Sequence, residues 1–239
     1  MTYKGEHVQL DVLTLDAGAS YRVEAPATDE IAVVLLVGEV EWLGVRSARA
    51  SVFEAPASAA YVPPGAAIDV VASSRSELAC VATVAGGLHA RGEAFVVTPD
   101  DVAVHHRGRD AWTRDVHDVI SESMPAQRLL VGETFNAPGG WSSFPPHKHD
   151  GTDGEIALEE VYYYRFDKPD GFGFQGLYER DGSERAVLVR DGSVVGIPRG
   201  FHPVCAAPGY RLYYLWALAG EERRLTMFED PAHRWLNAQ

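Results

Sequence analysis

The stretch AVLVRDGSVVGIPRGFHPV, residues 186–204, contains two apolar segments that are bounded by turn residues. An Asp-Gly pair separates the two segments, and a Pro-Arg-Gly sequence follows the second one. β-Branched residues on both sides of an Asp-Gly pair are typical of two strands joined by a tight turn. The stretch therefore predicts β-structure, and it places His202 directly after a turn.

The same pattern of short strands and turns extends through the rest of the chain. Segments rich in β-branched and aromatic residues recur between Gly and Pro turns, whereas long stripes with the period of a helix are scarce. This pattern favours an all-β barrel or sandwich. The segments that we expect to contain strands are 31–44, 59–72, 78–85, 128–136, 158–166, 171–179, 186–204 and 210–220.

The two halves of the chain share this organisation. Each half has a Pro/Gly turn at the end of a strand-like segment, in YVPPGAAIDV (61–70) and in GIPRGFHPV (196–204). The first turn is followed by alanine and isoleucine, whereas the second is followed by His202. Repetition of one pattern along a chain indicates a duplicated structure. We therefore expect two related barrels, of which only the second retains polar ligands.

This reading divides the chain into three parts. The middle part is more polar than its flanks, and we interpret it as a linker with some helix or edge strand within it. Its histidines, His105, His106 and His117, are expected at the surface or in structural hydrogen bonds. The three parts are a degenerate first barrel (1–97), the linker (98–127) and a metal-binding second barrel (128–239).

The composition limits the classes of partner. The chain has 239 residues, which allows one or two domains, and a formal net charge of -13. Nucleic acid is not expected as a partner, because phosphate binding requires a basic surface. An acidic protein of this kind must bind an anionic small substrate through a local group of basic residues.

The cellular setting is also suggested by the sequence. The two cysteines, Cys80 and Cys205, do not form a CxxC pair, so a thiolate metal site is not expected. The N-terminal sequence lacks an apolar signal-peptide core, and no apolar run is long enough to span a membrane. We therefore expect a cytoplasmic protein without a membrane partner.

A possible metal site begins in SSFPPHKHDGTDGEIALEEVYYYRF, residues 142–166. On a strand, residues i and i+2 point to the same face, so His147 and His149 would project together and Lys148 would point away. Two imidazoles on one face can bind one metal ion at about 2.0–2.1 Å per nitrogen. The alternative is a pair of solvent-exposed histidines, and further ligands decide between the two.

Three glutamates and one histidine are the further candidates. Glu155 is in a turn-like segment, which fixes side-chain geometry poorly. Glu159 and Glu160 begin a strand, and alternation allows only one of them to face the interior, so the other is expected as an outward, solvated charge. The residues alone leave open which of the two points inward. With His202, three imidazoles and one carboxylate would bind a divalent cation and leave positions open for a substrate.

Four segments, in this order, resemble the 5-deoxyglucuronate isomerase family of myo-inositol catabolism: WSSFPPHKHD, LEEVYYYRF, GFGFQ and PRGFHPV. The HxH pair, the glutamate at a strand start and the histidine after a Pro-x-Gly turn are similar to the cupin superfamily as a whole. The resemblance covers most of the chain and is densest over residues 128–220. It implies an all-β bicupin fold, that is, two tandem cupin-type jelly-roll β-barrels, with the metal site in the C-terminal barrel. The same fold is shared by the related 4-deoxy-uronate isomerases.

The resemblance implies four metal ligands, His147, His149, Glu160 and His202. Glu160 is preferred because in related uronate isomerases the ligand glutamate directly precedes a Val-Tyr pair, as Glu160 does here. Ten residues separate His149 from Glu160, which is more than in typical cupins. The implied cofactor is one divalent metal ion per chain; zinc is preferred, and manganese, iron and nickel suit the same donors.

The activity that the resemblance implies is an aldose–ketose isomerisation of 5-deoxy-D-glucuronate to 5-dehydro-2-deoxy-D-gluconate. A proton would move between C2 and C1, and the candidates for the catalytic base are Tyr162, on the face of Glu160, and Glu133, in the preceding strand. A metal-assisted hydride shift would need no base.

The substrate residues are chosen by proximity in the sequence. Arg199 is the candidate for the substrate carboxylate, because it is close to His202 and a guanidinium matches a carboxylate bidentately. Gln175 is the candidate for a sugar hydroxyl. The alternatives to an isomerase are a cupin dioxygenase with iron and a non-catalytic sugar-binding or regulatory cupin. Barrel edges of such folds often pair, so a homo-oligomer is an expected form.

Overall fold

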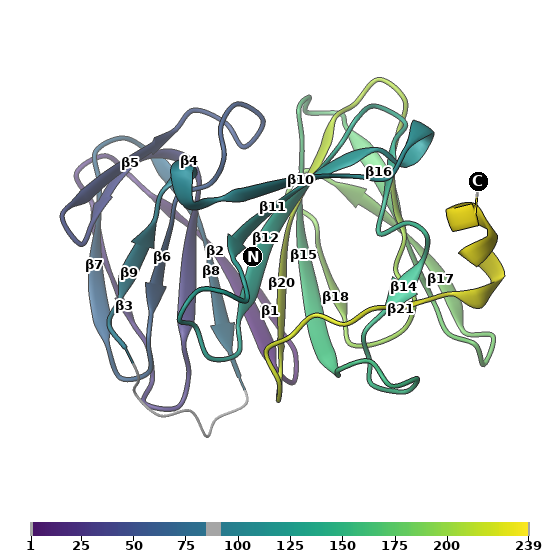
Figure 1. Ribbon diagram of the computed structural model, residues 1–239. Helices are drawn as coiled ribbons and strands as arrows, with labels where there is room; N and C mark the ends of the chain where they lie inside the picture. The colour runs from purple at the N-terminus through teal and green to yellow at the C-terminus, as the bar shows by residue number, and fades with distance from the viewer. Residues whose placement is uncertain (1, 85–91, 239) are drawn as a thin grey trace.

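The chain folds into two lobes of β-structure that lie side by side (Figure 1). The structure, a computed structural model, describes residues 2–84 and 92–238. None of the helices in this part of the chain is long and apolar enough to cross a membrane. The described helices are short 3-10 segments, η1 (Pro99–Asp101), η2 (Asp110–Trp112) and η3 (Pro231–Ala238). The all-β prediction is therefore confirmed.

The first lobe is built from antiparallel strands in the order β1-β2-β8-β4-β6-β9. Strands β5 and β7 pair with β4, and β3 pairs with β7, to form a second layer. Its strands are β1 (Thr2–Lys4), β2 (Val8–Leu15), β3 (Ser20–Glu24), β4 (Ile31–Trp42), β5 (Val45–Arg49), β6 (Ala59–Val62), β7 (Ala67–Ala72), β8 (Ser76–Thr83) and β9 (Phe95–Val97). The apolar run from residue 31 therefore forms one long central strand.

Gly38 marks the point at which β4 passes from one layer to the other. Before it, β4 pairs with β6 and β8, and from Gly38 onward it pairs with β5 and β7. Gly38 has a φ of +110°, and a Cβ atom there would lie 2.6 Å from the Cα of Ser76. Only glycine fits this bend without strain, which explains why the apolar run is interrupted at this residue.

The second lobe has a six-stranded sheet, β10-β11-β12-β20-β15-β18, and a four-stranded sheet, β13-β19-β16-β17. A short ladder of β14 with β21 completes it. Its strands are β10 (Ala103–Arg107), β11 (Arg114–Ile120), β12 (Leu130–Asn136), β13 (Trp141–Ser142), β14 (His147–Lys148), β15 (Leu158–Phe166), β16 (Phe172–Tyr178), β17 (Glu184–Arg190), β18 (Val194–Ile197), β19 (Val204–Ala206), β20 (Leu212–Gly220) and β21 (Phe228–Glu229).

The segment 98–127 has a larger role than a linker. Strands β10 and β11 form a hairpin, and β11 pairs with β12 along the edge of the six-stranded sheet. The prediction of an edge strand in this segment agrees with the structure. The hairpin also extends the six-stranded sheet of the second lobe, so the segment does more than connect the lobes. The division of the chain into domains stays a proposal.

The alternation of side chains along β15 separates two environments. Val161 and Tyr163 belong to the apolar core that lies between the lobes, which contains residues of both. Tyr162 and Tyr164 belong to a core inside the second lobe. Glu160 has the same parity as this second pair, so its carboxylate also enters the second lobe. The inward position of Glu160 therefore follows from the side-chain alternation of one strand.

A buried carboxylate of each lobe binds backbone N–H groups of the other. Glu30 precedes β4 and accepts hydrogen bonds from the backbone nitrogens of Gln127, Arg128 and Leu129, at 2.8, 2.6 and 2.7 Å. The hydroxyl of Tyr61 donates a hydrogen bond to the same carboxylate. Hydrogen bonds to a charged acceptor are stronger than neutral ones. Glu30 therefore fixes the start of the second lobe against the first.

Glu159 makes the corresponding contact in the opposite direction. Its carboxylate accepts hydrogen bonds from the backbone nitrogens of His7 and Val8, at 2.6 and 3.2 Å, and from the hydroxyl of Tyr3 at 2.8 Å. The side chain is buried, with 6% of the residue exposed. The prediction of an outward, solvated Glu159 is therefore wrong: this carboxylate faces the first lobe, whose N–H groups replace water.

Candidate metal centre

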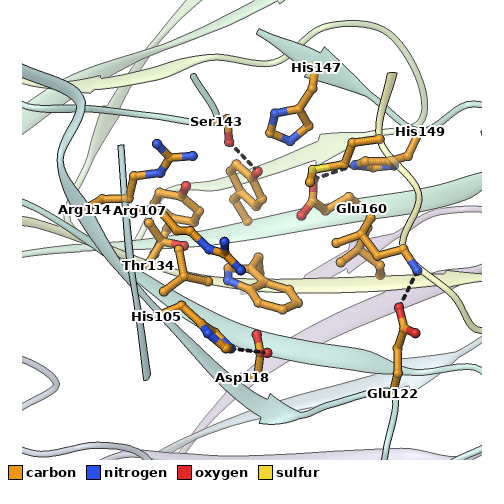
Figure 2. A pocket seen from close by; sticks show the side chains of 17 residues that line it. His105, Arg107, Arg114, Asp118, Glu122, Thr134, Ser143, His147, His149 and Glu160 are labelled. Atoms are coloured by element: carbon orange, nitrogen blue, oxygen red, sulfur yellow. Dashed lines mark hydrogen bonds and ion pairs between the residues drawn. The ribbon is translucent and has the colours of Figure 1, made fainter. Parts of the chain in front are cut away.

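A cavity of about 410 Å³ opens in the second lobe. Its walls come from the six-stranded sheet, from the segment that contains Ser143, His147 and His149, and from Leu225 and Met227 near the C-terminus. Figure 2 shows His149 and Glu160 on one side of this pocket and the side chains of the β10–β11 hairpin on another. The pocket therefore contains both the predicted ligands and residues that the sequence did not suggest.

Three of the predicted ligands meet beside this pocket. One donor atom each from His149, Glu160 and His202 lies within 4.8 Å of the others, and all three residues are buried. The Oε2 atom of Glu160 lies 3.2 Å from Nε2 of His149 and 3.4 Å from Nε2 of His202. We call these three residues the His–Glu–His centre. Within the described residues, it is the one group of His, Cys, Asp and Glu side chains close enough to hold a metal ion.

The backbone determines which imidazole nitrogen faces the centre. Nδ1 of His149 lies 2.9 Å from the carbonyl oxygen of Leu158, and Nδ1 of His202 lies 2.9 Å from that of Gly200. A carbonyl oxygen only accepts hydrogen bonds, so each Nδ1 carries a proton and each Nε2 is the nitrogen that faces the centre. This second-layer arrangement is common for histidines that bind metals through Nε2.

His202 also has an unsatisfied polar atom. Its Nε2 is buried and has no hydrogen-bond partner within the described residues. Buried polar groups normally have a partner, and an exception indicates a missing water, ion or ligand. Two imidazole nitrogens and one carboxylate are donors that suit divalent zinc, manganese, iron or nickel. The residues present therefore fit a divalent cation.

His147 lies at the edge of the centre. The centroid of its ring is 4.9 Å from that of His202 and 6.4 Å from that of His149. Its Nδ1 faces the carbonyl oxygen of Pro145 at 3.4 Å, and it lines the pocket. His147 does not belong to the group whose donor atoms lie within 4.8 Å. Its role as a fourth ligand stays a prediction.

The protonation states suit ligation. Burial lowers the pKa of His147 and of His202 to about 3, so both imidazoles are neutral near pH 7. Burial also disfavours the charged form of His149, but the hydrogen bond and charge of Glu160 outweigh it and raise the pKa of His149. A cation that takes the place of this proton would have the same favourable interaction with Glu160.

Lys148 anchors the ten-residue loop that separates His149 from Glu160. Its ammonium group is buried and lies 2.7 Å from Asp150 and 3.0 Å from Asp153, and it also contacts Glu155. Lys148 thus points away from the His–Glu–His centre, as predicted. The backbone nitrogen of Leu158 closes the loop by donating to the carbonyl of His149 at 2.8 Å. The expectation that Glu155 is poorly fixed is wrong, because the lysine binds its carboxylate.

Gln175 supports His202 from behind. It is fully buried, its Nε2 donates to the carbonyl of His202 at 2.8 Å, and its Oε1 accepts from the hydroxyl of Tyr164. Gln175 does not line the pocket. The structure therefore favours a role in positioning His202 over contact with a sugar hydroxyl.

Tyr162 lines the pocket, and its hydroxyl lies 3.0 Å from Oγ of Ser143. Burial and the nearby charge of Glu160 raise the pKa of Tyr162 well above its usual value of 10. The hydroxyl therefore stays protonated near neutral pH. It is placed to donate a hydrogen bond to a substrate oxygen. A catalytic base would have to be deprotonated, so the structure does not favour Tyr162 in that role.

Glu133 faces away from the pocket and toward the first lobe. Its carboxylate forms a bidentate ion pair with Arg49 of β5, with N–O distances of 2.7 and 2.9 Å, and accepts from the hydroxyl of Tyr213 at 2.7 Å. The neighbouring residue in β12, Thr134, is the one that lines the pocket. This geometry gives Glu133 a structural role between the lobes and does not favour it as a base.

Arg199 also lies away from the pocket. Its side chain is 65% exposed, and its Nε lies 3.1 Å from a carboxylate oxygen of Glu179. The pocket contains two other arginines, Arg107 and Arg114. Proximity to His202 in the sequence did not identify the basic residues of the pocket, because the turn that carries Arg199 directs it to the surface.

The β10–β11 hairpin supplies pocket residues that sequence reasoning missed. Besides the two arginines, it provides His105 and Asp118, whose Nε2 and Oδ2 atoms lie 3.0 Å apart (Figure 2). A signal was present, because His105 and Arg107 are two residues apart and so would share one face of a strand. This spacing was not used as a signal, because the segment was interpreted as a linker.

The fold and the site together define a class. Two lobes of antiparallel β-structure, with a buried His–Glu–His centre inside one of them, are the arrangement of a bicupin. More narrowly, the chain belongs to the KduI/IolB family, whose family model matches residues 1–236.

Known proteins agree with this assignment. The chain is 38% identical to a 5-deoxy-glucuronate isomerase of Geobacillus thermodenitrificans, over 97% of this chain and 86% of that protein. A crystal structure of an IolB-like protein from Salmonella typhimurium LT2 superposes with a TM-score of 0.88 at 34% identity, covering 97% of this chain and 90% of that one. The oxalate decarboxylase of Lactobacillus farciminis gives a TM-score of 0.69 at 14% identity, over 98% and 82% of the two chains. This last likeness concerns the fold alone.

Glu159 and Glu160 are expected to give opposite results when each is changed to glutamine. Glu160→Gln should remove most of the bound metal with little loss of stability, because it weakens one donor of the centre. Glu159→Gln should keep the metal but lower the free energy of unfolding by about 1–3 kcal/mol, because it replaces a charged acceptor of backbone N–H groups. Metal content and urea unfolding would measure both effects. Loss of metal in Glu159→Gln alone would reverse the assigned parity of β15.

Proposed function

We propose that the chain is an aldose–ketose isomerase that converts 5-deoxy-D-glucuronate to 5-dehydro-2-deoxy-D-gluconate. The observation that carries this proposal is the similarity to 5-deoxy-glucuronate isomerases over nearly the whole chain, at 38% identity for the Geobacillus thermodenitrificans protein. The pocket in the second lobe supports it, because histidine, arginine, carboxylate and hydroxyl side chains line it and could bind the oxygens of a small sugar acid.

The reaction moves one carbon-bound hydrogen and one hydroxyl proton within the substrate, and it needs no external oxidant or reductant. The hydrogen on C2 moves to C1 and the proton of the C2 hydroxyl moves to the oxygen on C1, so C2 becomes a ketone and the C1 aldehyde becomes an alcohol. We propose His147, His149, Glu160 and His202 as ligands of one divalent ion per chain, with zinc as first choice. Such an ion supplies a Lewis acid that polarises a substrate carbonyl.

The remaining pocket residues have separable tasks in this proposal. The protonated Tyr162 donates a hydrogen bond to a substrate oxygen, held in orientation by Ser143. The His105–Asp118 pair has the composition of a general base whose imidazole is oriented by a carboxylate, and it lines the same pocket. We propose this pair, in preference to Glu133, as the group that takes up and returns the proton.

Two alternative functions have different requirements. A cupin dioxygenase would consume oxygen during turnover, and a sugar-binding cupin would bind the sugar acid without converting it. The test is to follow 5-deoxyglucuronate and its product by ¹³C NMR with purified protein under air and under argon. We expect equal conversion under both gases. Turnover that stops under argon would indicate a dioxygenase, and binding without conversion would indicate a binding protein.

The wider setting follows from the same proposal. Action in myo-inositol degradation, a cytoplasmic location, a homo-oligomeric state and the absence of nucleic-acid partners all stay predictions.

A further inference from the structure

Two arginines are directly opposite each other on the β10–β11 hairpin. Arg107 of β10 and Arg114 of β11 are Cα partners in the ladder, and both line the pocket that contains His149 and Glu160. Figure 2 shows both side chains in this pocket, beside Thr134 and apart from the two ligands. We call Arg107 and Arg114 the arginine pair. Its position at the wall of the pocket raises the question of what balances its charge.

The carboxylates of the pocket have other partners. Asp118 pairs with His105 at 3.0 Å, Glu122 accepts from the backbone nitrogen of Leu225 at 2.7 Å, and Glu160 belongs to the His–Glu–His centre. Throughout residues 2–84 and 92–238, no ion pair joins either member of the arginine pair to a carboxylate.

Among the described residues, the side chain of Arg114 donates one hydrogen bond, from Nη1 to the carbonyl oxygen of Trp112 at 3.3 Å. Its remaining N–H groups are therefore available to a ligand.

The arrangement costs free energy in the absence of an anion. Like charges directly opposite each other on neighbouring strands are destabilising. Burial, together with the charge of Arg107, lowers the pKa of Arg114, which reflects this cost. Carboxylates are abundant in this chain, whose net charge is -13, yet none of those in the described residues forms an ion pair with Arg107 or Arg114. A bound anion would offset both the repulsion and the loss of water.

We propose that the arginine pair binds the carboxylate group of the sugar-acid substrate and so orients the sugar with its carbonyl end toward the His–Glu–His centre. This inference rests on the proposed function for the identity of the substrate. A guanidinium presents two parallel N–H groups that match the two oxygens of a carboxylate. Because a carboxylate is itself a good ligand for divalent cations, the arginine pair also keeps the wrong end of the substrate away from the centre.

The experiment measures binding without turnover. The probes are 5-deoxyglucuronate reduced at C1 to the alcohol, which cannot isomerise, and the neutral carboxamide of the same compound. Calorimetry with the purified wild-type protein should show the acid binding about 10- to 100-fold more tightly than the amide, as expected for hydrogen bonds between charged groups. Arg114→Gln and Arg107→Gln should each remove most of this preference.

Two further variants separate charge, geometry and position. Arg114→Lys keeps the charge but not the paired N–H groups, so it should recover part of the preference. Arg199→Gln removes an exposed arginine outside the pocket and should leave the preference unchanged. A merely structural role predicts a lower Tm for Arg114→Gln, whereas relief of the like-charge repulsion predicts an unchanged or higher Tm.

The outcomes distinguish this inference from the proposed function. If the wild type isomerises 5-deoxyglucuronate and both glutamine variants keep the full preference for the acid, the inference is wrong and the proposed function stands. A fall in Tm with equal weakening of both probes, which leaves the preference for the acid unchanged, would also overturn it. If the preference depends on the arginine pair but the wild type does not isomerise, the proposed function is wrong and the pair binds the carboxylate of another compound.

Discussion

His149→Ala and His202→Ala are each expected to lose most of the bound metal and most of the activity while the fold is retained. Each change removes an Nε2 donor that the backbone holds toward the His–Glu–His centre. The fall in kcat/KM should exceed the roughly 10- to 100-fold loss that follows removal of residues that only support a ligand. Metal analysis, turnover and circular dichroism of each variant would measure the three effects.

His106 provides a matched control for these variants. It lies on β10, is exposed, and pairs with Asp115 outside the pocket, with 2.6 Å between Nδ1 and Oδ1. His106→Ala should therefore keep full metal content and turnover. Full metal occupancy together with full turnover in His149→Ala or His202→Ala would show that the changed residue is not a ligand. His147→Ala is expected to change in the same direction, and the same result there would remove His147 from the ligand set.

Glu133→Gln is expected to lower the free energy of unfolding by about 3–5 kcal/mol, because removal of one partner leaves a buried charge uncompensated. The side chains of Glu133 and Arg49 are 0% and 1% exposed, so water cannot replace the lost carboxylate charge. Since Glu133 faces away from the pocket, turnover at temperatures well below the unfolding transition should be unchanged. Urea unfolding and kcat at low temperature would separate the two effects.

The control for Glu133 is the double variant Arg49→Met with Glu133→Leu. Replacing a buried ion pair by apolar residues of similar size is often nearly neutral, so most of the lost stability should return. A large fall in kcat for Glu133→Gln without a loss of stability would contradict the structural role and would favour Glu133 as the catalytic base.

The features that sequence reasoning predicted are those set by local rules. Alternation along the strand 158–166 allowed one glutamate to face inward, and the resemblance identified it as Glu160, which the structure places in the second lobe. The turn before His202 directs this residue to the centre. In both cases a short segment determines the direction of the side chain, so neighbouring residues carry the necessary information.

The features that it missed depend on partners far away in the sequence. Glu159 was expected in water, but its donors are at the N-terminus of the chain, and Glu133 pairs with Arg49 of the other lobe. The β10–β11 hairpin lies at the edge of the sheet and turns polar side chains into the pocket, so it lacks the apolar alternation by which strands are recognised. Without that pattern the segment resembled a linker, and Arg107 and Arg114 were not considered.

The most direct test of the central claim is a titration of activity against bound metal. The protein would be freed of metal with a chelator and reconstituted with measured amounts of zinc, and in parallel with manganese, iron and nickel. Bound metal per chain and conversion of 5-deoxyglucuronate would be measured on the same samples. The account predicts no turnover without metal and a linear rise that ends at one ion per chain. Full turnover of the metal-free protein, or a rise that ends at two ions per chain, would contradict it.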